Sequence, residues 1–105
     1  MTYKALVKLA LTMPHVEEGT SYGTPALKIK KKFFVRLRAE ENGTVIVLRM
    51  PFEDREALMA EAPEKFFITD HYKDYPAVLV RLPKVTEAEM RDLLNVAHRE
   101  VLAKK

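Results

Sequence analysis

The chain has no cysteine and only three glycines among its 105 residues. Without cysteine it forms no disulfide and performs no thiol chemistry. Three glycines do not supply a phosphate-cradling glycine-rich loop. Ser21 is the only serine, and nothing in the sequence places it beside a histidine that would activate it. The sequence therefore carries no signature of a defined reaction and does not indicate an enzyme.

Long apolar runs are also missing. No stretch approaches the roughly 20 consecutive apolar residues that a membrane-spanning helix needs. Residues 1–14 contain Lys4 and Lys8 among scattered apolar residues, not the continuous apolar segment of a signal peptide. We therefore expect a cytoplasmic protein that has no association with a membrane.

Length and composition favour one globular domain over residues 1–105. Hydrophobic residues make up 48% of the chain and charged residues 31%, which is typical of a folded protein and not of a disordered one. The formal net charge of +3 is mild. Any argument for a nucleic-acid partner must therefore come from where the charges lie.

Three helices are predicted from apolar spacing and end signals. The first covers residues 2–11, where apolar residues recur with helical spacing. The second begins after Pro51 with acids in its first turn and ends near Pro63. The third begins with the capping box formed by Thr86 and Glu89 and continues as a clear apolar stripe.

Five strands are predicted between these helices, over residues 26–30, 33–38, 44–50, 65–68 and 77–82. Lys31–Lys32 connects the first two strands, and Asn42–Gly43 is a hairpin signal before the third. Residues 15–24 are interpreted as a loop because they contain two glycines and precede Pro25. The expected fold is α+β, with the order α-β-β-β-α-β-β-α. A three-stranded meander and two further strands form an antiparallel sheet, and helices pack mainly on one face.

Strand alternation separates the two faces of this sheet. Leu27, Ile29, Val35, Leu37, Ile46 and Leu48 fall on the face expected to meet the helices. Basic residues fall on the other face and at the hairpin tip: Lys28, Lys30, Lys31, Lys32, Arg36, Arg38, Arg49 and Arg81. Phe34 is assigned to this basic face, and Val45 and Val47 interrupt it. The acids gather in helices and turns, so we expect a lopsided charge distribution. The alternative is an ordinary solvated sheet face.

The densest group of reactive side chain types is the segment Asp70, His71, Tyr72, Lys73, Asp74 and Tyr75. His71 can titrate near neutral pH, Asp70 could orient it, and Lys73 could hold an anion. The spacing of Asp70, His71 and Asp74 matches no strong metal motif, so neither a metal nor another cofactor is predicted. The alternative interpretation is structural: His71 and Tyr72 bury their rings against the sheet.

Several segments carry a resemblance to a known family. They are Pro14–Glu18, Gly23–Pro25, Met50–Pro51 and Thr69–Val78. Together with the order of elements, they make nearly the whole chain resemble the MmcQ/YjbR-like family. That resemblance implies a double-wing fold and a DNA-binding label that rests on fold analogy. It supplies no catalytic residues.

Three function hypotheses remain open. The leading one is a small non-enzymatic binding protein that takes DNA or another polyanion on the basic sheet face. The second is a protein-interaction module, either chaperone-like or forming a homodimer. The third is a small-ligand or enzymatic site around His71 and Tyr75.

Overall fold

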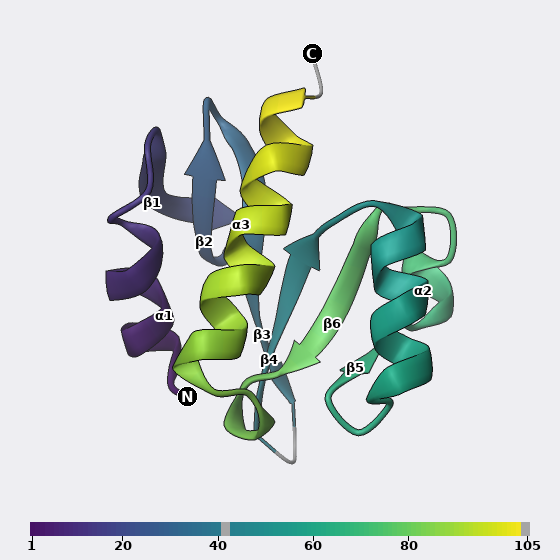
Figure 1. The fold of residues 1–105 in the computed structure, drawn as a ribbon. Coiled ribbons are helices and arrows are strands. Elements are labelled where there is room, and N and C mark those ends of the chain that lie inside the picture. The colour runs from purple at the N-terminus through teal and green to yellow at the C-terminus, as the bar shows by residue number, and fades with distance from the viewer. Residues whose placement is uncertain (41–42, 104–105) are drawn as a thin grey trace.

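A computed structural model describes residues 1–40 and 43–103. The elements are α1 (Tyr3–Ala10), β1 (Val16–Ser21), β2 (Thr24–Ile29), β3 (Lys32–Glu40), β4 (Gly43–Arg49), α2 (Phe52–Glu61), β5 (Phe66–Phe67), β6 (Ala77–Arg81) and α3 (Glu87–Ala103), with two short 3-10 helices, η1 (Asp70–Tyr72) and η2 (Leu82–Lys84). All strand pairs are antiparallel, in the order β1-β2-β3-β4-β6-β5. Figure 1 shows α3 lying across this sheet between α1 and α2.

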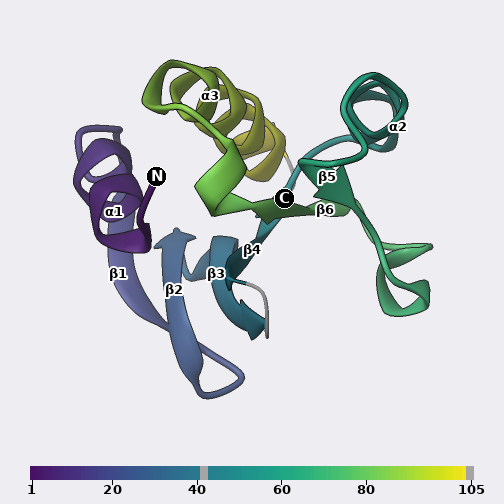
Figure 2. The same ribbon diagram turned by 90° about the horizontal axis from the view of Figure 1, so that it is seen from below.

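The predicted fold class is confirmed: an antiparallel sheet carries its helices mainly on one face. Seen from below in Figure 2, α1 and α3 lie above the strands, and the segment between β5 and β6 hangs on the opposite side. Within the described ranges, no helix is long and apolar enough to cross a membrane. The expected Asn42–Gly43 turn involves residues 41–42, which lie outside the described residues.

The main core lies between the sheet and helices α1 and α3. Leu27, Ile29, Ile46 and Leu48 are fully buried there, together with Leu94 of α3. Their alternation along β2 and β4 sends every second side chain to the helices. The predicted division of the sheet into two faces therefore holds for these strands.

The expected loop at residues 15–24 is wrong, because Val16–Ser21 forms β1 and pairs along its length with β2. β1 is an edge strand whose side chains are mostly exposed on both faces, so it shows no apolar alternation. A two-residue turn at Tyr22 and Gly23, both with positive φ, joins it to β2. β1 also brings Glu17 opposite Lys28, so the acids are not confined to helices and turns.

Phe34 lies on the helix face, contrary to its assignment from simple alternation. The register between β2 and β3 shifts at Leu27 and Lys28, which makes Phe34 an extra residue in β3. A bulge of this kind interrupts the period of two. Phe34 is therefore fully buried against the helices, whereas Phe33 faces the other side.

Candidate functional site

The open face of the sheet is the side away from α1 and α3. The segment from Thr69 to Pro76, which includes η1, folds over part of it (Figure 2). Tyr72 is buried there and Tyr75 is half-buried, and both pack in a small second core with Val47 and Leu79. Val45 and Val47 pack beneath this segment, which explains why apolar residues stand among the basic residues of this face.

Each tyrosine hydroxyl accepts a hydrogen bond from an arginine of the open face. Arg36 on β3 donates to the Tyr72 hydroxyl, and Nη1 of Arg49 on β4 donates to the Tyr75 hydroxyl at 2.7 Å. The Arg49 guanidinium carbon also lies 5.5 Å from the ring centre of Phe33 and 5.3 Å from that of Tyr75. The two rings are parallel, with centres 6.2 Å apart. Cation–π attraction thus holds Arg49 beside two aromatic rings.

The positive charges of Arg36 and Arg49 have no carboxylate partner among residues 1–38 and 44–103, whose side chains the structure describes. The Nε atom of each is buried and makes no hydrogen bond. A neutral tyrosine hydroxyl satisfies one donor of a guanidinium that has five. Partly buried charges without a counter-charge are costly. The two arginines are only half-buried and therefore offer an uncompensated charge to an anion.

A small hollow of about 80 Å³ opens beside these arginines, lined by Tyr22, Phe33, Arg36, His71, Tyr72 and Tyr75. Tyr22 reaches it from the β1–β2 turn and is 90% exposed. Its ring centre lies 5.6 Å from the guanidinium carbon of Arg36. Aromatic and cationic groups therefore meet here, and no acid lines the hollow.

Arg55 fixes the segment that carries the two tyrosines. It is 2% exposed and projects from α2. Its guanidinium donates hydrogen bonds to the backbone carbonyls of four residues, at 2.7–2.8 Å: Tyr72, Lys73, Tyr75 and Ala77. Arginine suits this task because its planar fork directs several donors at once. The positions of both tyrosines on the open face thus depend on a side chain from a distant helix.

A sequence profile described as YjbR matches residues 11–100. The chain belongs to the YjbR family. The resemblance inferred from Pro14–Glu18, Gly23–Pro25 and Thr69–Val78 is thereby confirmed.

Relatives of this YjbR chain include the uncharacterized proteins Rv2570 and MT2646 of Mycobacterium tuberculosis and Mb2600 of Mycobacterium bovis. Each is 32% identical to it over 75 residues, which is 70% of this chain and 58% of the relative. The match thus covers less than two thirds of each relative's length.

The predicted basic residues of the YjbR chain are only partly brought together. Strand pairing places Lys28, Arg36, Arg38, Arg49 and Arg81 on the open face. Lys30 and Lys31 instead form the exposed β2–β3 turn, both with positive φ, in place of the expected Lys31–Lys32 connection. Lys32 begins β3 opposite Ile29, which points to the helices. Arg81 lies 4.0 Å from the Phe67 ring centre and donates to two backbone carbonyls.

The segment proposed as a ligand loop divides into buried and exposed side chains. Tyr72 packs inward as the structural interpretation required, whereas Asp70, His71 and Lys73 are exposed. The His71 ring meets the Tyr72 ring edge to face, with centres 4.9 Å apart. In the described part of the chain, no three acidic or histidine side chains lie close enough together to hold a metal ion.

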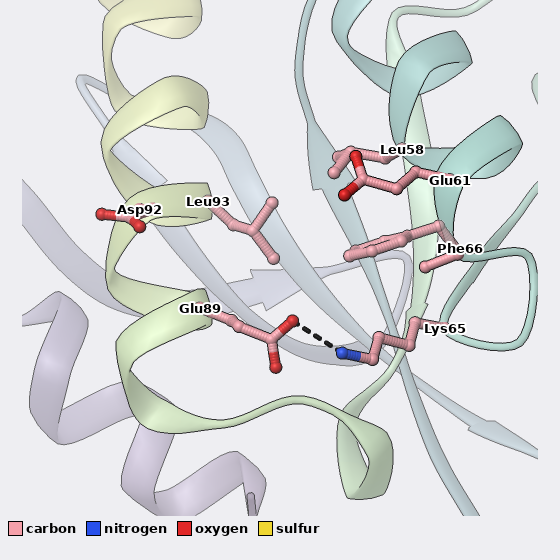
Figure 3. A pocket seen from close by; sticks show the side chains of 8 residues that line it. Leu58, Glu61, Lys65, Phe66, Glu89, Asp92 and Leu93 are labelled. Atoms are coloured by element: carbon pink, nitrogen blue, oxygen red, sulfur yellow. Dashed lines mark hydrogen bonds and ion pairs between the residues drawn. The ribbon is translucent and has the colours of Figure 1, made fainter.

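A larger hollow of about 240 Å³ lies on the helix side, between α2 and α3 (Figure 3). Leu58, Phe66 and Leu93 line its interior, and Lys65 and Glu89 point at each other across its mouth at 2.7 Å. The hydrogen bond from Lys65, and next that from the Thr86 N–H, holds the pKa of Glu89 below its usual value. Lys65 is thus paired with a carboxylate, whereas Arg36 and Arg49 form no ion pair with the carboxylates of the described side chains.

Sequence reasoning did not reveal the position of Phe33 or the role of Arg55. Phe33 lies on the open face because of the bulge at Phe34, which carries no sequence signal. Arg55 resembles an ordinary surface residue of a helix, since its partners are backbone carbonyls from another segment. From the sequence, Tyr22 beside Gly23 was interpreted either as a ring that stacks on a base or, preferably, as a solvent-facing ring that covers the first strand. Its approach to Arg36 depends on β1, which was not predicted.

Proposed function

We propose that this chain is a non-enzymatic binding protein that holds a nucleic acid on the open face of its sheet. The observation that carries the proposal is the pair of half-buried guanidiniums, Arg36 and Arg49, which hydrogen-bond to neutral tyrosines and face no carboxylate among the described residues. Arginine suits phosphate because its donors match two oxygens at once.

The surroundings of the two arginines support a polymeric anion. Lys28 on the same face is half-exposed, and Lys30 and Lys31 project from the adjoining turn. Among the described residues no carboxylate forms an ion pair with any of these lysines. Several cations spread along a face can each meet a phosphate and release its condensed counterions. Contacts of this kind give affinity and register without reading the base sequence.

The test is fluorescence anisotropy with a labelled DNA duplex and a single strand of equal length, across a series of NaCl concentrations. We expect binding at low salt, with the logarithm of the association constant falling linearly with the logarithm of salt concentration. In the double variant Lys28→Gln/Lys31→Gln, the slope should fall by about one for each lysine that no longer meets a phosphate.

The matched control is Lys4→Gln/Lys8→Gln, which removes the same charge from exposed positions on α1, on the helix side. Its salt slope should equal that of the wild type. Absence of binding to both probes at low salt, or binding that ignores salt, overturns the proposal. An equal reduction of the salt slope in the control would show that binding depends on the net charge of the protein and not on the lysines of the open face.

A further inference from the structure

We infer that the hollow beside Tyr22 takes a single unstacked base, so that the open face prefers single-stranded nucleic acid. This inference rests on the proposed function and adds the ligand's structural class to it. Phosphates would meet the arginines and lysines of the face, and one base would lie against the Tyr22 ring. The observations behind it are the ring's exposure, its neighbours, and the shape of the hollow.

The backbone conformation of Tyr22 is unfavourable for a tyrosine, and the side chain makes little packing contact that would offset this. Its φ is 53°, in the left-handed region that favours glycine and asparagine at the tip of a two-residue hairpin. Its ring is 90% exposed, the largest exposed fraction among the large hydrophobic residues of the described chain. Folding therefore gains little from this ring, which stays available to a ligand. Aromatic rings in this situation serve as stacking platforms for bases.

The neighbours of Tyr22 supply the remaining parts of a nucleotide site. The guanidinium carbon of Arg36 lies 5.6 Å from the ring centre, and Arg36 is half-buried, so its guanidinium can meet a phosphate next to the stacked base. His71 and Tyr72 also line the hollow, and the polar atoms of the exposed His71 can meet the edge of a base. Every group named is a donor or an aromatic surface, which suits the acceptor-rich nucleotide.

The size of the hollow favours a single strand over a duplex. At about 80 Å³ it accepts one edge of a base and leaves the rest against Tyr22. Bases in a duplex are paired and stacked, so a base could reach Tyr22 only after it has been unpaired and unstacked, which is unfavourable. A single strand can present a base without that cost. The sheet alongside can then follow the backbone, as sheets do in other single-strand binders.

The experiment compares three labelled probes of equal length at one low salt concentration: oligothymidylate, an abasic strand with the same phosphates, and a DNA duplex. Wild-type protein should bind oligothymidylate about tenfold more tightly than the abasic strand, the effect of one base stacked on an aromatic ring. Tyr22→Asn should bind both strands equally. Asparagine tolerates the turn conformation, so this variant is expected to fold. Tyr22→Trp should restore the preference.

The outcomes separate this inference from the function it rests on. Equal, salt-dependent binding of oligothymidylate and the abasic strand overturns the base site and leaves the nucleic-acid proposal intact. Tighter binding of the duplex also overturns it. Absence of binding to all three probes removes both. A thymidylate preference that survives in Tyr22→Asn, with the variant's fold verified by circular dichroism, shows that the base lies elsewhere and overturns the inference.

Discussion

A single buried arginine organises the open face from the opposite side of the sheet. Arg55 directs its guanidinium at four backbone carbonyls of the segment that carries Tyr72 and Tyr75. Its ion-pair partner, the carboxylate of Glu56, is exposed and lies 3.4 Å from Nε. The carbonyls therefore contribute most of the stabilisation of this charge, and they in turn have exchanged water for the guanidinium as their hydrogen-bond partner.

We expect Arg55→Met to lower the free energy of unfolding by about 3 kcal/mol, because it leaves several buried carbonyls without donors. Arg55→Lys should recover little, since an ammonium lacks the planar fork that reaches four acceptors. Urea denaturation measures both variants. The matched control is Arg91→Met on α3, where an exposed arginine has only an i,i+4 ion pair at 3.8 Å, and the change should stay within about 0.5 kcal/mol. Equal effects in the two variants would contradict this role for Arg55.

The phenylalanines of β3 show where sequence reading fails at the scale of one residue. Alternation assigned Phe34 to the basic face, but the bulge turns Phe34 to the helices and Phe33 to the open face. An inserted residue in a strand is fixed by the pairing with its neighbour and leaves no mark on local composition. The bulge matters for function because it is Phe33, and not Phe34, that stacks with Tyr75 beside Arg49.

At the scale of elements, strong local signals predicted well and weak ones did not. The capping box of α3 is present, with the Thr86 N–H donating to Glu89 at 3.1 Å and the Glu89 N–H donating to the Thr86 hydroxyl at 3.2 Å. Edge strand β1 was not predicted, because its polar sequence is mostly glutamate, glycine and serine. These residues are uncommon in strands or favour turns. Only pairing with β2 makes it a strand, and pairing is not a local property.

The ion pair of Glu89 with Lys65 predicts a dependence of stability on pH. The pKa of Glu89 is lower in the folded chain than its ordinary 4.5, mainly because Lys65 donates a hydrogen bond to the carboxylate. Its stabilising contribution is therefore complete above about 4.5 and disappears as the pH falls through the lower folded value. For a partly exposed pair we expect about 0.2–1 kcal/mol.

Glu89→Gln isolates this contribution, because glutamine keeps the acceptor for the Thr86 N–H and removes only the ionisation. Denaturation of the wild type and the variant at a series of pH values gives the difference between them. That difference should be constant from about pH 7 to about pH 5 and shrink toward about pH 3. A difference that stays flat over the whole range would mean that the carboxylate's charge adds nothing beyond the cap.

For the molecule as a whole, the charges are sorted between two surfaces. Within residues 1–40 and 43–103 the ion pairs of the helix side involve Lys65, Arg91 and Arg55 with glutamates of α2 and α3. None of these pairs reaches Arg36 or Arg49 across the sheet. A net charge of only +3 is thus compatible with two half-buried arginines, Arg36 and Arg49, that form no ion pair within residues 1–38 and 44–103. The apolar core and the sheet lie between the ion pairs of the helix side and the arginines of the open face, and so keep the two groups of charges apart.

This separation predicts that a multivalent anion stabilises the fold at constant ionic strength. Inorganic pyrophosphate bound on the open face and present at about ten times its Kd would add about 1.4 kcal/mol, which raises the Tm of a domain of this size by about 6–11 °C. Differential scanning fluorimetry with pyrophosphate against NaCl at matched ionic strength measures the shift. Arg36→Gln should abolish most of it, because the replacement keeps a donor for Tyr72 but removes the charge. Lys4→Gln/Lys8→Gln should keep it, and a shift that disappears there and persists in Arg36→Gln would place the anion on the helix side.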